Sequence, residues 1–67
     1  MPRDPHTIGL DELEIHERTR RILLYASCNT VADIVLAGRF KLLKTPNCGP
    51  VTLKDIQQAV SRFGYGF

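Results

Sequence analysis

Histidine and cysteine are scarce in this sequence, and no apolar run is long enough to form a signal peptide or to span a membrane. The two cysteines, Cys28 and Cys48, stand alone, without the spacing of a zinc finger or of a disulfide framework. We therefore expect two reduced, partly buried thiols in a cytoplasmic protein, with no bound metal ion and no membrane contact.

The groups that catalysis requires are also few. His6 and His16 lie on either side of a predicted turn, and no serine or cysteine has an evident base partner. The segment Cys48-Gly49-Pro50 lacks the lysine and serine of a glycine-rich phosphate-binding loop. The sequence therefore predicts a binding protein without a cofactor and without catalytic residues, and not an enzyme.

The protein is close to the lower size limit for a core that holds without metal or disulfides. It has 67 residues, 43% of them hydrophobic, which predicts one small folded domain. The net charge is only +2, so total charge says little about partners. The distribution says more, because acidic residues cluster over 11–17 and basic residues follow at Arg18, Arg20, Arg21, Arg39, Lys41, Lys44 and Lys54.

Helical periodicity recurs along the sequence and no strand pattern is present, which predicts an all-α fold. Residues 1–9 show no periodicity and are expected to form a flexible arm before a domain over residues 10–67. We expect a compact bundle of four to five short helices, with helices near 16–25, 31–36, 39–44 and 50–62. Thr30 and Asp33 form a capping-box pattern before the second of these helices.

The apolar positions of these helices predict the core. The residues expected to face inward are Ile15, Ile22, Leu23, Ala26, Val31, Ile34, Val35, Phe40, Leu43, Leu53, Ile56, Val60 and Phe63. Arg18, Arg21 and Tyr25 are spaced at i, i+3 and i+7 and should share another face of the first helix. Gly64 is expected to end the last helix, and the tail over 65–67 is expected to fold back on the core.

Two prolines indicate a helix-hairpin-helix between residues 42 and 56. Pro46 should end the preceding helix near Lys44, and Pro50 suits the first position of the next helix with Gly49 as its N-cap. The backbone N–H groups of residues 51–53 are then expected to point out of the helix, where a phosphate can be held. This arrangement is typical of proteins that bind the nucleic-acid backbone.

The same stretch closely resembles a known family. The run Leu42-Leu43-Lys44-Thr45-Pro46-Asn47, then Gly49, Leu53 and Ile56, resembles the C-terminal domain of the bacterial RNA polymerase α subunit. Further matching positions follow without a gap, at Asp11, Leu13, Glu14, Arg18, Leu23, Asp33, Val35 and Gly64. The resemblance covers roughly residues 10–67 and that domain alone. With the initial Met, it indicates a small stand-alone protein or an excised domain.

The resemblance implies a nucleoid-associated bacterial protein that binds double-stranded, A·T-rich promoter DNA through the minor groove and backbone. By position, Arg18 matches the arginine that enters the groove, and Arg21 stands where the family usually has an asparagine that helps to read it. Four further residues match the DNA surface around the hairpin: Lys44, Asn47, Gly49 and Thr52. Each also has a structural explanation, since Lys44 suits a helix C-terminus and Asn47 suits a tight turn.

Two departures from the family pattern bear on DNA binding. Pro50 and Val51 replace two lysines of the usual hairpin end, which removes two positive charges and one backbone donor. The alternative is a protein-interaction module of the same fold that contacts RNA polymerase or a transcription regulator without binding DNA. A helix-hairpin-helix accessory of a repair enzyme fits the motif but not the flanking match.

Overall fold

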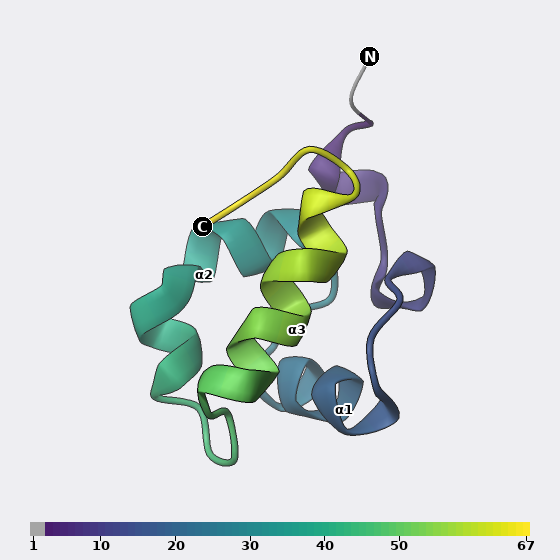
Figure 1. The fold of residues 1–67 in the computed structure, drawn as a ribbon. Coiled ribbons are helices and arrows are strands. Elements are labelled where there is room, and N and C mark those ends of the chain that lie inside the picture. The colour runs from purple at the N-terminus through teal and green to yellow at the C-terminus, as the bar shows by residue number, and fades with distance from the viewer. Residues whose placement is uncertain (1–2) are drawn as a thin grey trace.

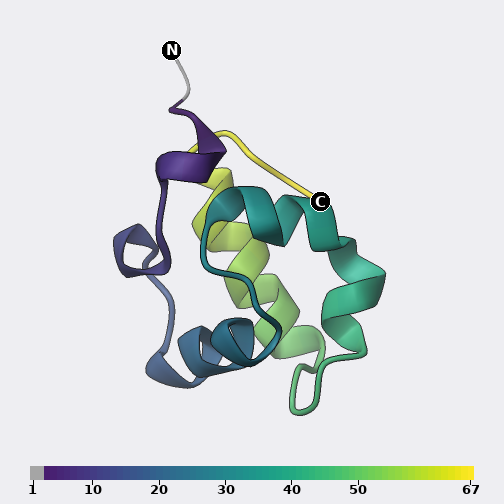
Figure 2. The ribbon, with the colours of Figure 1, turned by 180° about the vertical axis from the view of Figure 1, so that it is seen from behind.

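The computed structural model describes residues 3–67, which form three α-helices and two short 3₁₀-helices without a strand. The α-helices are α1 (Glu17–Tyr25), α2 (Val31–Leu43) and α3 (Pro50–Ser61), and the 3₁₀-helices are η1 (Pro5–Thr7) and η2 (Leu10–Glu12). Helix α3 runs through the middle of the fold, with α1 near its start and α2 alongside it (Figures 1 and 2). The all-α class is confirmed, whereas the expected four to five helices are not.

Helix α2 is broken at Gly38. This residue has φ 77° and ψ 172°, far from helical values and in a region that glycine adopts readily. The break lies where the sequence predicted a gap between two separate helices, and it changes the direction of α2 so that the helix bends around α3 (Figure 1). The capping box at the start of α2 is confirmed, since Thr30 and Asp33 each accept a hydrogen bond from the other's backbone N–H.

One apolar cluster forms the core beneath all three helices. Most of the residues expected inside belong to it: Ile22, Leu23, Val31, Ile34, Leu53, Ile56 and Val60. Four others that were expected inside pack against it and are only partly buried: Ile15, Ala26, Val35 and Phe63. The cluster also contains three residues from before the first α-helix, Ile8, Leu10 and Leu13. The free cysteines Cys28 and Cys48 also lie in it, and burial raises the pKa of both thiols, which keeps them protonated. No helix among residues 3–67 is long and apolar enough to cross a membrane.

The prediction for the second half of α2 was wrong. Leu42 is fully buried, whereas Phe40 and Leu43, which were expected inside, are 76% and 40% exposed. The reason is the break at Gly38. Helical phase cannot be carried across a residue with non-helical φ and ψ, so the rotation of the five residues that follow is set by packing and not by the periodicity of the first half.

Residues 4–9 pack against the domain, which differs from the expected flexible arm. Asp4 caps η1 by accepting the N–H of His6 at 2.9 Å. Ile8 is fully buried, its carbonyl accepts the N–H of Val31 at 3.0 Å, and Gly9 forms an isolated bridge with Thr30. A segment without helical periodicity can still be ordered when its backbone pairs with a neighbour. The expected arm also included residues 1 and 2, which lie outside the described residues.

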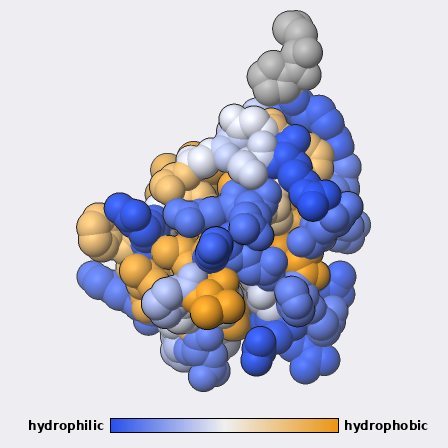
Figure 3. Space-filling model, in the orientation of Figure 1, coloured by the Kyte–Doolittle hydropathy of each residue, from blue (hydrophilic) through white to orange (hydrophobic). Residues whose placement is uncertain are grey.

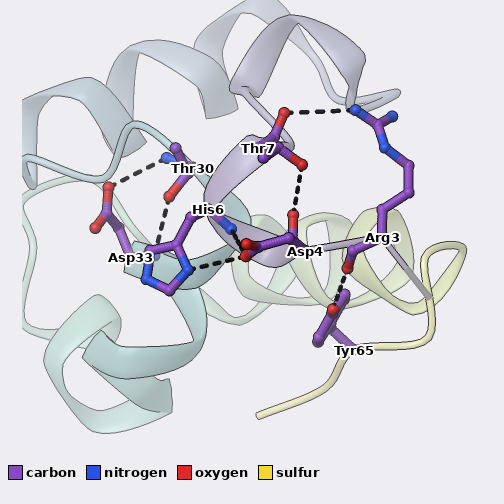
Figure 4. Close-up of polar contacts among 7 residues, drawn as sticks. All are labelled: Arg3, Asp4, His6, Thr7, Thr30, Asp33 and Tyr65. Carbon is purple, nitrogen blue, oxygen red and sulfur yellow. Dashed lines mark hydrogen bonds and ion pairs between the residues drawn. The ribbon is translucent and has the colours of Figure 1, made fainter.

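The two ends of the described region meet over the same end of the core. Helix α3 ends as expected near Gly64, which has φ 87°, and the aromatic tail packs against the core. The Tyr65 hydroxyl donates to the carbonyl of Arg3 (Figure 4), and the Gln57 amide donates to the carbonyl of Phe67 at 3.2 Å. These contacts hold the tail where it covers the core.

Candidate nucleic-acid interface

The turn between α2 and α3 has the geometry that its two prolines predict. The N–H of Thr45 donates to the Leu42 carbonyl at 3.0 Å and the N–H of Cys48 donates to the Thr45 carbonyl at 3.1 Å, which closes the turn. Asn47 adopts φ 67°, a left-handed conformation that asparagine tolerates better than most residues. Asn47 therefore has a conformational role in the turn, whatever else it contacts.

Gly49 is the N-cap of α3 and Pro50 is its first residue, as the sequence predicted. Gly49 has φ −97° and ψ −176°, an extended conformation open to any residue, and a Cβ at this position would meet no atom within 4 Å. The free domain therefore does not need glycine here for its conformation or its packing. What the missing Cβ provides is room for a partner to approach the backbone at the start of α3.

Fewer backbone N–H groups are free at the start of α3 than the three that the sequence predicted. The N–H of Leu53 donates to the Gly49 carbonyl at 3.0 Å, so it is already used within the helix. The N–H groups of Val51 and Thr52 have no acceptor in the part of the protein that the structure describes. Two orphan donors at a helix N-terminus, beside the partly exposed Thr52 hydroxyl, can hold one phosphate group.

Two adjacent hollows bring most of the predicted site residues together. The first is lined by Arg18, Arg21, Ile22, Tyr25, Pro46 and Asn47. The second is lined by Arg18, Asn47, Gly49, Pro50, Val51 and Thr52. Arg18 and Asn47 line both, so they lie between the exposed face of α1 and the start of α3. Lys44 lines neither hollow: it is the C-cap of α2, where its charge suits the helix end.

The α1 arginines differ in their ion pairs. Arg21 and Arg20 lie 3.5 Å and 3.9 Å from the carboxylate of Glu17, and such exposed pairs contribute little to stability. Arg18, in contrast, has no carboxylate within ion-pair distance among residues 3–67. An exposed guanidinium without a partner in the same molecule remains available for an anionic ligand.

A partly buried polar contact joins α1 to α3 beside this surface, and no pattern in the sequence indicated it. The Asp55 carboxylate accepts the Thr19 hydroxyl at 2.8 Å and the N–H of His16 at 3.3 Å, and Thr19 is only 3% exposed. Burial acts to raise the pKa of Asp55, but the hydrogen bonds from Thr19 and His16 outweigh it, so the pKa lies below its usual value. This contact fixes α1, and with it Arg18, against the start of α3.

We expect Thr19→Val to lower the free energy of unfolding by about 1–2 kcal/mol at neutral pH, because it removes the hydroxyl from a partly buried hydrogen bond to a carboxylate. The unfolded pKa of an aspartate is about 3.9 and the folded pKa of Asp55 is lower, so the contribution is complete above about pH 5. It is lost as the pH falls through the folded pKa. Urea denaturation at several pH values measures the effect.

The matched control for this prediction is Thr19→Ser, which keeps the hydroxyl and should keep the pH dependence of stability. A cost of Thr19→Val that is the same at every pH would contradict a hydrogen bond to the Asp55 carboxylate.

Within residues 3–67, histidine, cysteine and carboxylate side chains do not gather in a group of three or more that could hold a metal ion. The surface is suited to holding an anionic backbone, since it combines free guanidinium and amide groups with two orphan N–H donors.

Comparison with known proteins relates this sequence to a family of polymerase domains. The model of the family described as the C-terminal domain of the alpha subunit of bacterial RNA polymerase matches residues 2–62. The DNA-directed RNA polymerase subunit alpha of Lawsonia intracellularis is 34% identical over 59 residues, which cover 88% of this protein. The 67-residue sequence spans 17% of the length of that relative. No solved structure matches it.

Proposed function

Since the protein belongs to the family of C-terminal domains of the bacterial RNA polymerase alpha subunit, a non-catalytic domain of the polymerase, its role lies in transcription, and we propose that it performs this role by binding double-stranded DNA. The proposed contact is to the minor groove and backbone of A·T-rich promoter DNA. The second half of α2, the turn over residues 44–49 and the start of α3 act in it as a helix-hairpin-helix.

One observation carries the proposal: Arg18, without an ion pair among the described residues, lies between the two hollows at the start of α3. An arginine in this position can enter a narrow A-tract minor groove, whose negative potential is enhanced. Beside it, the N–H groups of Val51 and Thr52 and the Thr52 hydroxyl hold a phosphate at the edge of the groove. Gly49 lets that backbone approach closely, since no Cβ stands in its way.

The charge of this surface is lower than the family pattern implies. Val51, which is 82% exposed, stands where the family has a lysine, and Pro50 offers neither a charge nor an N–H. Arg21 adds one charge, with its side chain 79% exposed. Each phosphate contact that is lost lowers the salt dependence of binding by about one unit, so we propose moderate affinity and a shallow salt dependence.

We expect Arg18→Ala to weaken binding to an A-tract duplex by about 1–3 kcal/mol, and to weaken binding to a G·C-rich duplex less, because only the narrow groove rewards the inserted guanidinium. Thr52→Val should weaken binding to both duplexes evenly, as the loss of a phosphate contact does. Fluorescence anisotropy with labelled duplexes at low salt measures both effects.

Two controls make this test specific. Arg20→Ala removes an equal charge from α1, but Arg20 lines neither hollow, so its effect should be small. Gly49→Ala should weaken DNA binding while changing stability by less than about 1 kcal/mol, because its Cβ meets nothing in the free domain. Wild-type protein that binds neither duplex more tightly than about millimolar would exclude the DNA function.

A second surface favours the alternative, a protein-interaction module that contacts RNA polymerase or a transcription regulator. On α2, Leu36 is 87% and Phe40 is 76% exposed, and the guanidinium of Arg39 lies 5.8 Å from the centre of the Phe40 ring. Figure 3 shows apolar surface over the second half of α2 and around the start of α3. Large apolar side chains that are this exposed are typical of protein contacts. If the protein binds neither duplex, this alternative is the function that we propose.

A further inference from the structure

The exposed aromatic ring of Tyr25 has no structural explanation within the domain. Tyr25 is the last residue of α1 and is 74% exposed, and its hydroxyl has no hydrogen-bond partner among residues 3–67. A tyrosine that packed in the core would be buried. A tyrosine whose only role was to end the helix would have no reason to lie beside other candidate binding residues. This ring lies on the helix face that carries Arg18 and Arg21 and lines a hollow with both of them.

The composition of this hollow fits a sugar–phosphate backbone. Its cations are Arg18 and Arg21, its amide is that of Asn47, and its apolar parts are the rings of Tyr25 and Pro46 beside Ile22. A phosphate is held by guanidinium and hydroxyl donors, and the apolar edge of a deoxyribose packs against rings. Tyr25 offers both, because its ring is apolar and its tip is a hydroxyl donor.

The position of Arg18 relates this hollow to the second one. Arg18 lines both hollows, with the start of α3 on one side and Tyr25 and Arg21 on the other. A side chain inserted into a minor groove has one sugar–phosphate strand on each side, and the groove is only about 6 Å wide. If the start of α3 holds the phosphate of one strand, the hollow at Tyr25 faces the other strand.

We propose that Tyr25 is a further DNA-binding residue of this protein, and that the hollow it lines with Arg21 takes the sugar–phosphate backbone of the second strand. This inference rests on the proposed DNA function and adds to it a second backbone contact. It also gives Arg21 the role of a phosphate contact in place of a base-reading one. The contact compensates for the charge that is absent at Pro50 and Val51.

The test measures the affinity of the 67-residue protein for a fluorescein-labelled A-tract duplex by anisotropy. Tyr25→Ala is expected to weaken binding about three- to tenfold, as the loss of one hydrogen bond and one apolar contact does. Tyr25→Phe keeps the ring and loses the hydroxyl, so its affinity should lie between those of Tyr25→Ala and the wild type. Leu24→Ala is the matched control, because Leu24 is also exposed on α1 but lines a different hollow.

The strand is identified with duplexes in which one phosphate is replaced by an uncharged methylphosphonate. Neutralising the phosphate that Tyr25 is proposed to contact should remove the effects of Tyr25→Ala and Arg21→Ala on affinity, while the effect of Thr52→Val remains. Neutralising the phosphate that the start of α3 contacts, on the opposite strand, should remove the effect of Thr52→Val and leave those of Tyr25→Ala and Arg21→Ala. Circular dichroism checks that each variant is folded, which is expected because all of these side chains are at least partly exposed.

The outcomes separate the inference from the proposed function. Wild-type protein that does not bind duplex DNA overturns both. Binding that depends on Arg18 but is unchanged within about twofold in Tyr25→Ala overturns the inference alone. The inference is also overturned if Tyr25→Ala and Thr52→Val lose their effects with the same phosphate, because both would then contact one strand.

Discussion

Leu42→Ala is expected to lower the free energy of unfolding by about 2–5 kcal/mol, because Leu42 is fully buried and the truncation leaves a cavity between α2 and the rest of the core. A domain of 67 residues has a total stability of only about 3–10 kcal/mol, so this variant should be largely unfolded at modest urea concentrations. Urea denaturation followed by circular dichroism measures the change.

Leu43→Ala is the matched control for Leu42→Ala, since the chemistry is the same and the next residue of the same helix is 40% exposed. Its cost should stay below about 1.5 kcal/mol, because the side chain is only partly removed from water. The pair therefore tests the rotation of α2 after Gly38. If Leu43→Ala costs more than Leu42→Ala, the second half of α2 is turned as the sequence periodicity suggested.

Ile8→Ala is the second change with a large expected effect, again about 2–5 kcal/mol of unfolding free energy. Ile8 is fully buried although it precedes the first α-helix, and the hydrogen bond from Val31 to its carbonyl holds its backbone at the start of α2. Removal of residues 1–9 takes away the same side chain, this hydrogen bond and the η1 helix, so its cost should be larger. Thermal and urea denaturation of both variants measure the loss.

His6→Ala is the control for the N-terminal segment, because His6 belongs to the same segment but its side chain is 79% exposed. Its ring hydrogen-bonds only to Asp4 among the residues drawn in Figure 4. The effect of His6→Ala should lie within about 0.5 kcal/mol. A neutral Ile8→Ala would mean that residues 4–9 are detached in solution, as the sequence suggested. DNA binding by the variants is informative only at temperatures where each remains folded.

The sequence predicted those features that depend on neighbouring residues. Helices expected near residues 16–25 and 50–62 are found at Glu17–Tyr25 and Pro50–Ser61. Prolines, caps and the glycine after α3 act within about one turn of a helix, so they can be recognised in a linear sequence. The family was recognised from the turn over residues 44–49 and its flanking residues, and the family comparison confirms it.

The candidate site was predicted only in part. Helical spacing alone places Arg18, Arg21 and Tyr25 on one face of α1, but it does not say what that face lies beside. The contact of Thr19 with Asp55 brings residues 36 positions apart together and holds this face at the start of α3. Lys44 lines neither hollow although it is close to Asn47 in the sequence. The direction of its side chain depends on how α2 ends, which the sequence did not predict.

By itself, the sequence determined the all-α class, the ends of α1 and α3, the chemistry of the turn between α2 and α3, and the family. Only the tertiary structure decided that Leu42 and not Leu43 is buried, that Ile8 belongs to the core, and that Arg18 lies between two hollows. The physical reason is the distance along the sequence over which each interaction acts. Caps and prolines bias the backbone of their immediate neighbours, whereas burial is decided by contacts between segments far apart in the sequence, which no local pattern contains.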